Sequence, residues 1–431
     1  MRDLAAAAVT VFALSLSAAL AAQSGKSQTD NEIRFFQWKV SQDPDDFFNY
    51  DRLGVAYIQK ARETGDVTYY DLATNALVKS LDLESAHPEA AAAKKHLATV
   101  YYANHRFSEA LALAQEAVQL NPRDITPYGL IGDARSEMGD YAEAWAAYGH
   151  LGTAESGIQY LQQTRASAES LLKGETGAAI EHMRRAVNIS VESAMPRESI
   201  AWSYFTLGED YFMAGDCDRA QAAYAEALKV YPGYHRALAG AAKVASAQGH
   251  LAEAIDFYRK AIGVIPLPAY AASLGDVYTK AGKTAEARRE YDLVEYIGRL
   301  NTFNRVVYNR ELAAFYADHD IHQAEALELA RKEFEVRHDI YTWDTLAWAL
   351  YRNRKYDEAA AAITAALRLN TRDAMLFFHA GLIHEGLGDK AKAADFLGRA
   401  LELNPQFNLL FADVARADLA KLAGEERDAQ R

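Results

Sequence analysis

The chain has 431 residues, of which half are hydrophobic and 24% are charged, with 25 Gly but only 9 Pro. This composition is typical of a folded protein and excludes a low-complexity or disordered chain. Lys and Arg together number 46 against 59 Asp and Glu, and the formal charge of −13 argues against an unpatterned binder of nucleic acid or of anionic membranes.

The first residues form an apolar segment over residues 4–24 that ends in small residues, with an A-x-A cleavage site at residues 19–21. This pattern predicts a secretory signal peptide over residues 1–22, and therefore a periplasmic or secreted protein. Because only Arg2 and the α-amino group are positive and Asp3 is negative, an uncleaved membrane anchor stays open as an alternative. No cysteine follows the apolar segment, so the pattern lacks the residue that a bacterial lipoprotein acylates.

A pattern of small and aromatic residues then recurs through most of the chain. One copy consists of Leu207, Gly208, Tyr211, Gly215, Ala220, Tyr224, Ala227 and Pro232. Copies aligned on Leu207, Ala241 and Leu274, and on Leu346 and Ala380, are 33 or 34 residues apart. The small residues suit helices that approach closely, Gly215 suits a helix end with positive φ, and Pro232 stops the following helix. Packing therefore explains these residues better than chemistry does.

The period and the order of residue types resemble the tetratricopeptide repeat family. The resemblance implies an all-α fold, a right-handed superhelical solenoid of about ten repeats, each with two antiparallel helices. The repeats begin near residues 47, 91, 125, 160, 201, 235, 268, 306, 340 and 374. After the signal peptide we expect a linker and half repeat over 23–45, N-terminal repeats over 46–193, central and C-terminal repeats over 194–405, and a capping helix with a polar tail over 406–431.

In that family the first helix of each repeat lines a concave groove. Side chains outside the packing signature would point into it: Trp202, Phe205, Glu209, Phe212, Met213, Tyr341, Asp344, Trp348, Tyr351, Phe378 and Leu382. Aromatic and Met side chains are common interface anchors, which favours an apolar partner segment, extended or helical. The alternative is that these side chains pack against neighbouring first helices.

Acidic residues also fall at groove positions, namely Asp133, Glu137, Glu209, Asp276 and Asp344. Uncompensated acids would favour a partner that carries basic residues.

Motifs for chemistry are missing from the sequence. It contains no phosphate-binding loop, no nucleophile elbow and no zinc helix, so we expect no enzyme and no cofactor. His319 and His322 are weak candidates for a metal site, but their place in a turn between helices favours a structural role. Cys217 is the only cysteine, which excludes an intramolecular disulfide, and we expect it to be a small buried hydrophobic residue.

The C-terminal repeats resemble exported bacterial tetratricopeptide proteins that are mostly uncharacterised. We therefore expect a non-catalytic scaffold of the bacterial cell envelope that binds protein partners in the groove, in assembly or transport. We expect no nucleic acid and contact with a membrane only through a partner, and leave the oligomeric state open. The alternative is an accessory binding protein for a metal ion or small ligand, associated with a membrane transport system.

Overall fold

The computed structural model describes residues 28–152, 156–303 and 309–429. The predicted signal peptide over residues 1–22 lies outside them. The described residues form 22 helices and no strand, which confirms the predicted all-α fold. The chain divides into two compact units, residues 1–100 and residues 101–431. The domain division expected from the sequence, with its boundary at residues 193 and 194, stays a prediction.

Unit 1 contains α2 (Gln28–Gln42), α3 (Phe47–Thr64), α4 (Thr68–Leu83) and most of α5 (Ala90–Ala103). Helix α3 begins where the Asp46 carboxylate accepts hydrogen bonds from two free amides of the first turn, and it ends at Gly65 with φ 74°. Gly54 lies against the side chain of Leu77 in α4, where an added Cβ would come within 2.5 Å of Leu77 Cγ. A small residue is therefore required at this helix contact.

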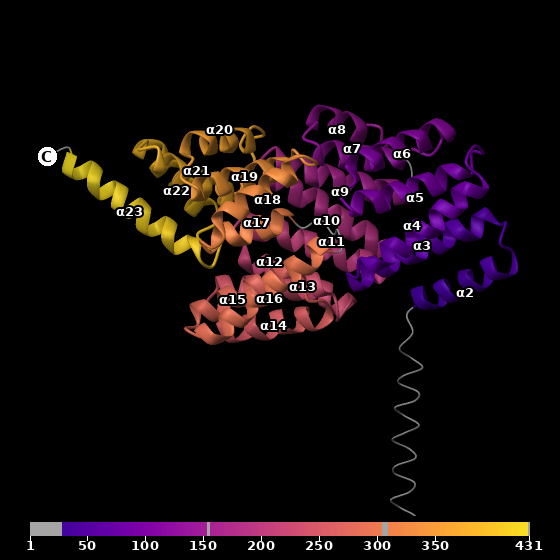
Figure 1. Ribbon diagram of the computed structural model, residues 1–431, viewed down its shortest axis with the longest axis horizontal. Helices are drawn as coiled ribbons and strands as arrows, with labels where there is room; N and C mark the ends of the chain where they lie inside the picture. Colours follow the sequence, from indigo (N-terminus) through magenta and orange to yellow (C-terminus); the bar gives the residue numbers. More distant parts are fainter. Residues whose placement is uncertain (1–27, 153–155, 304–308, 430–431) are drawn as a thin grey trace, which may run out of the picture. The chain divides into compact units, whose positions relative to one another are not determined.

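Unit 2 continues the alternation of first and second helices (Figure 1). Its helices are α6 (Phe107–Leu120), α7 (Pro127–Glu137), α8 (Tyr141–Tyr148), α9 (Ser156–Leu172), α10 (Thr176–Glu192), α11 (Arg197–Met213), α12 (Cys217–Val230), α13 (His235–Ala247), α14 (Leu251–Val264), α15 (Pro268–Lys280), α16 (Thr284–Phe303), α17 (Asn309–Asp318), α18 (Gln323–Phe334), α19 (Ile340–Arg352), α20 (Tyr356–Ala366), α21 (Ala374–Gly386), α22 (Lys390–Leu403) and α23 (Phe411–Ala429). From α3 to α22 the described helices form the ten expected repeats, preceded by α2 and followed by α23.

The signature residues pack as the repeat pattern predicts. Gly208 in α11 faces the ring of Tyr224 in α12, and a Cβ at that position would overlap the ring. Tyr224 is fully buried, and the same ring lies against Gly240 in α13, the first helix of the next repeat. One aromatic side chain thus fills the space between two repeats, which only glycine at both contacts allows.

In unit 2 each first helix packs on its own second helix and also on the next first helix. The pairs α11 with α13, α13 with α15, α15 with α17, α17 with α19 and α19 with α21 are all in contact. Because first helices lie closer together than second helices do, the stack curves with the first helices on its inner side. This inner side is where the sequence predicts a partner-binding groove, and that role stays a prediction.

Candidate partner-binding groove

The groove residues of the middle repeats lie on α11. Trp202, Phe205, Glu209 and Met213 are half-buried, whereas Phe212 is buried. The Phe205 ring lies 6.0 Å from the ring of Tyr224 and 6.3 Å from that of Tyr234, between centroids. Four of the five side chains therefore keep surface that a partner can contact.

The groove residues of the C-terminal repeats are packed more tightly. Trp348 is 2% exposed, and its indole is stacked between Tyr351 at 5.0 Å and His379 at 4.3 Å. Phe378 is fully buried and stacks on Phe411 of α23 at 5.0 Å. These rings contact one another, as in the alternative that the sequence left open.

Polar groups complete this C-terminal cluster. The Trp348 indole N–H donates to Asp318 Oδ1 at 2.8 Å, and His379 Nδ1 lies 2.9 Å from Asp344 Oδ1. Desolvation raises the pKa of Asp318 to about 6. Burial acts to lower the pKa of His379, but the Asp344 carboxylate outweighs it and raises that pKa. The buried aromatics are thus held in one arrangement by hydrogen bonds and charge.

Of the eleven candidate residues, Phe212, Asp344, Trp348, Phe378 and Leu382 are buried, and Trp202, Phe205, Glu209, Met213, Tyr341 and Tyr351 are half-buried. The role of the set in partner binding stays a prediction, and the half-buried members are those that a partner can reach in this conformation.

Groove acids are paired within the chain by residues that the sequence did not predict as their partners. Glu209 accepts from the Tyr224 hydroxyl at 2.5 Å and from Lys243 Nζ of the next first helix at 2.6 Å. The same arrangement holds Asp133 with Tyr148 and Arg165, and Asp276 with Tyr291 and His319. In all three the tyrosine follows the acid by 15 residues, a spacing that the sequence already contains.

The two remaining acids also have basic partners. Glu137 Oε2 lies 2.8 Å from Arg337 Nε, and Asp344 pairs with His379. All five predicted groove acids are therefore compensated within the chain, so a partner that carries basic residues would compete with internal cations.

The candidate metal ligands lie apart from any cluster of ligands. His319 Nε2 is 2.7 Å from Asp276 Oδ1 and its Nδ1 is 2.8 Å from the Phe315 carbonyl oxygen. His322 is half exposed and lies 3.7 Å from Glu295. Among residues 28–152, 156–303 and 309–429, no three His, Cys, Asp or Glu side chains are grouped to hold a metal ion.

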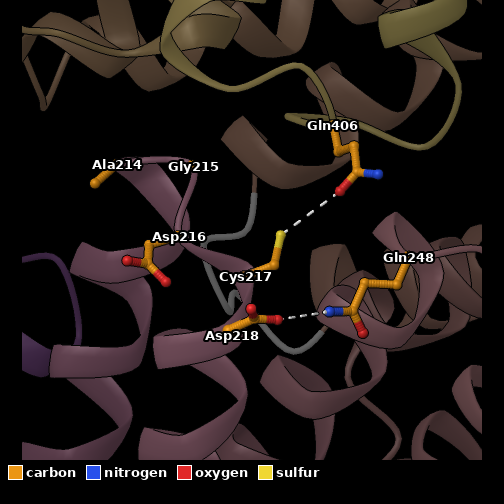
Figure 2. Close-up of a pocket in the computed structure, with 7 residues that line it drawn as sticks. All are labelled: Ala214, Gly215, Asp216, Cys217, Asp218, Gln248 and Gln406. Atoms are coloured by element: carbon orange, nitrogen blue, oxygen red, sulfur yellow. Dashed lines mark hydrogen bonds between the residues drawn. The ribbon is translucent and has the colours of Figure 1, made fainter.

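Cys217 lines a shallow surface pocket of about 470 Å³ beside the turn between α11 and α12 (Figure 2). The thiol is half-buried and lies 3.7 Å from Gln406 Oε1, so it is less buried than the sequence predicted. Desolvation and the nearby carboxylates of Asp218 and Asp216 raise its pKa. The thiol form is favoured, which is the opposite of what a nucleophilic cysteine needs.

A separate aromatic surface lies in unit 1. Phe35 and Trp38 on α2 are 50% and 55% exposed, Phe48 on α3 is 49% exposed, and Lys39 and Arg52 lie over these rings. The sequence pattern did not predict this surface because α2 lies outside the repeat signature. Within the described part of the chain, no helix is both long and apolar enough to cross a membrane.

Comparisons with known proteins agree with the repeat architecture. Two family models, both described as tetratricopeptide repeat, match residues 164–233 and residues 59–125, 205–272 and 345–406, together more than half of the chain. The TPR repeat-containing protein MJ1428 of Methanocaldococcus jannaschii is 21% identical over 377 residues, which cover 86% of this chain and 59% of that relative. The chain thus spans less than two thirds of the relative's length.

Two solved structures give low similarity scores. The yeast Tom70 structure is 12% identical with a TM-score of 0.34, covering 88% of this chain and 97% of that one. A tetratricopeptide repeat protein of Parabacteroides merdae is 18% identical with a TM-score of 0.35, covering 61% of this chain and 98% of that one. Tetratricopeptide repeats support a protein–protein interaction scaffold, and the fold is generally not enzymatic. On its sequence matches and its helix pairs, the chain belongs to the tetratricopeptide repeat family.

Proposed function

We propose that this chain is an exported, non-catalytic scaffold of the bacterial cell envelope that holds a partner segment in the groove of its middle repeats, in assembly or transport. The observation that carries the proposal is the half-buried set of Trp202, Phe205 and Met213 on α11. These side chains offer aromatic and thioether surface on the inner side of the stack. Such surface gives large contact area at a small loss of side-chain entropy.

The partner segment that fits is apolar, extended or helical, and carries few charges at its centre. Glu209 is already paired with Lys243 and Tyr224, so the acid beside the aromatics does not need a basic residue from the partner. Breaking that pair to form a new one would give little net gain. Specificity would therefore come from the shape of the aromatic surface.

The proposal is tested by photo-crosslinking from position 213. A photo-reactive residue replaces Met213 in a chain that starts at residue 23, and the protein is irradiated with the envelope fraction of its native cells. The matched control places the same residue at Tyr296, an aromatic position on the second helix α16 that is 56% exposed. We expect one defined adduct from position 213 and none from position 296, with the adduct lost in a Trp202→Ala variant. Equal patterns from both positions would exclude the groove as the binding surface.

Export is tested separately by the mass of the protein recovered from cell fractions. We expect a mature chain that begins at residue 23 in the periplasm or the medium. A cytoplasmic chain that retains residues 1–22 would contradict the envelope proposal without affecting the groove.

The alternative, an accessory binding protein for a metal ion or small ligand, has less support. Both ring nitrogens of His319 already have partners in the described structure. A thermal shift with divalent metals that disappears in a His319→Ala, His322→Ala variant would favour this alternative over the scaffold.

A further inference from the structure

Unit 2 carries a series of contacts between segments that are almost 200 residues apart. The backbone N–H of Ile340 donates to the Tyr141 hydroxyl at 2.9 Å, a separation of 199 residues. The Thr371 hydroxyl donates to the Leu172 carbonyl, again 199 residues away. Asn404 Nδ2 donates to the Phe212 carbonyl at 2.8 Å, 192 residues away.

Each of these contacts joins a turn within one repeat to a link between two other repeats. The first side is always in or next to the turn within a repeat, between α7 and α8, α9 and α10, or α11 and α12. The second side is always the link between repeats that precedes α19, follows α20 or follows α22. An offset of 199 residues is about six repeats of 34 residues. We call residues 309–429 the second coil and residues 101–152 and 156–303 the first coil. Residues 338–406 of the second coil thus lie in register on residues 137–217 of the first.

Three glycines mark the same places. Gly139, Gly174 and Gly215 have φ of 80°, 76° and 78°, and each faces a backbone carbonyl oxygen of the second coil. A Cβ on Gly139 would lie 2.6 Å from the His338 oxygen, and one on Gly215 would lie 2.7 Å from the Leu403 oxygen. The equivalent turns at Gly249, Gly282 and Gly388 have φ of 79°, 71° and 79°, but an added Cβ there meets nothing within 4 Å.

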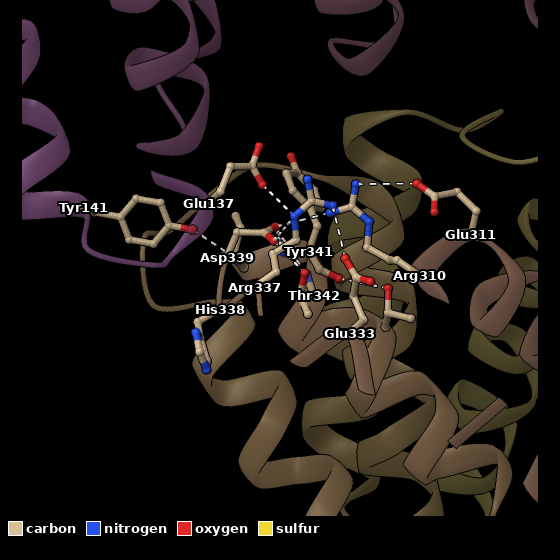
Figure 3. Close-up of polar contacts among 12 residues, drawn as sticks. Glu137, Tyr141, Arg310, Glu311, Glu333, Arg337, His338, Asp339, Tyr341 and Thr342 are labelled. Atoms are coloured by element: carbon tan, nitrogen blue, oxygen red, sulfur yellow. Dashed lines mark hydrogen bonds and ion pairs between the residues drawn. The ribbon is translucent and has the colours of Figure 1, made fainter. Parts of the chain in front are cut away.

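A buried charged cluster forms the most extensive of these contacts (Figure 3). Arg337, 5% exposed, follows α18 in the second coil, and its Nε lies 2.8 Å from Glu137 Oε2 in the first coil. The same guanidinium lies 3.5 Å from Glu333, while the His338 N–H donates to the Glu137 carbonyl at 3.0 Å. Removal of one charge from such a cluster in the closed coil would leave its partner buried and uncompensated.

We propose that these contacts are a latch that closes the coil of unit 2 and controls access to the groove on α11. This inference rests on the proposed function, because it concerns the regulation of that same groove. Phe212, a groove residue, supplies one of the latch carbonyls at the end of α11, one residue from Met213. The contacts fix the pitch of the stack, and a partner segment that touches the half-buried side chains of the closed coil gains the rest of the groove when the second coil moves off the first.

The glycines provide a matched test. A triple variant, Gly139→Ala, Gly174→Ala and Gly215→Ala, places a methyl group against the second coil at three turns. The control triple, Gly249→Ala, Gly282→Ala and Gly388→Ala, imposes the same left-handed φ on alanine without that clash. A difference in compactness between the two variants therefore reports the latch and not the left-handed φ.

The single cysteine is a native reporter for opening. Cys217 lies in the pocket that Gln406 of the second coil helps to line, so its reaction with a thiol reagent measures separation of the two coils. Because Gly215 lines the same pocket as Cys217, the rate is compared between the doubles Gly139→Ala, Gly174→Ala and Gly249→Ala, Gly282→Ala. We expect the first double to react at least about threefold faster than wild type and the latch triple to have a larger radius of gyration in solution scattering, with both controls unchanged. Identical rates for the two doubles would overturn the latch.

A milder variant tests the latch even if the triple variant does not fold. Thr371→Val keeps the side-chain shape and removes the hydroxyl that donates to Leu172, and we expect faster amide exchange at residues 370–372 in the folded chain. Unchanged exchange would count against the latch.

The crosslink at position 213 then separates the two proposals. A higher yield in the latch triple than in the control supports gating of the groove, and an unchanged yield overturns gating. Opening without a crosslink in any variant would mean that the latch exists and the proposed groove function fails.

Discussion

The grooves of the middle and the C-terminal repeats differ although the same repeat positions line both. Glu209 on α11 is half-buried, whereas Trp348 at the same position of α19, two residues after the signature leucine, is 2% exposed. Helix α13, next to α11, carries the small Ala239 where α21, next to α19, carries the large Phe378. A groove position is therefore open or filled according to the size of the side chains on the following first helix.

This difference shows that a repeat position does not have one function. In the C-terminal repeats the residues that resemble interface anchors complete the core with Phe411 of the capping helix, 6.0 Å from Trp348 between ring centroids. In the middle repeats, residues of the same type keep free surface. Substitutions in the middle and in the C-terminal repeats test this difference.

The largest expected effect is that of Trp348→Ala. Truncation of a buried indole should lower the free energy of unfolding by about 3–5 kcal/mol, whereas truncation of the half-buried Trp202 should cost less than half as much. Because Trp348 is 2% exposed, we expect this change to lower stability more than it weakens partner binding. Denaturant titrations of both variants measure the difference. Equal losses would mean that the two grooves are equally packed.

Gly208→Leu tests the close contact between the first and the second helix of one repeat. The added side chain would overlap the Tyr224 ring, so we expect a loss of about 1–3 kcal/mol in the free energy of unfolding from overpacking. Gly398→Leu in α22 is the control, because an added Cβ there meets no atom within 4 Å. We expect this control to change stability by no more than about 0.5 kcal/mol. A neutral Gly208→Leu would show that the repeat register is wrong.

Asp210→Asn tests whether one buried carboxyl group makes the stability of the middle repeats depend on pH. Asp210 is 3% exposed, and desolvation raises its pKa to about 7. Between its unfolded pKa of about 4 and this value, the native state binds more protons, so the free energy of unfolding falls as pH rises. Asn removes the charge, and we expect a gain of about 1–3 kcal/mol at pH 8 and little change at pH 5. If the free energy of unfolding rose by the same amount from pH 5 to pH 8 in the wild type and in the variant, the raised pKa assigned to Asp210 would be wrong.

The smallest effect is expected for Lys243→Met, at most about 1 kcal/mol. Its pair with Glu209 is about one third exposed on both sides, so water screens the charges. The matched change on the C-terminal side, His379→Leu, leaves Asp344 without its buried partner and should cost several times more. Urea titrations at low and high salt check both, since only the exposed pair should depend on salt.

Much of the fold could be predicted from local pattern. Gly208 and Tyr224 are 16 residues apart and meet within one repeat, so their spacing in the sequence is enough to reveal the contact. The pairs of acid and tyrosine 15 residues apart were equally visible, although only their regular recurrence would have revealed them. The exposure of Trp202 and the burial of Trp348 could not be predicted from one repeat, because each depends on the next.

The all-α repeat architecture, the number of repeats and the residues between paired helices can be predicted from the sequence, because all of these depend on contacts within about 34 residues. The exposure of each groove residue and the place where the second coil meets the first are known from the structure alone. The meeting of Tyr141 with Ile340 depends on small rotations summed over about six repeats, and no single repeat encodes that sum.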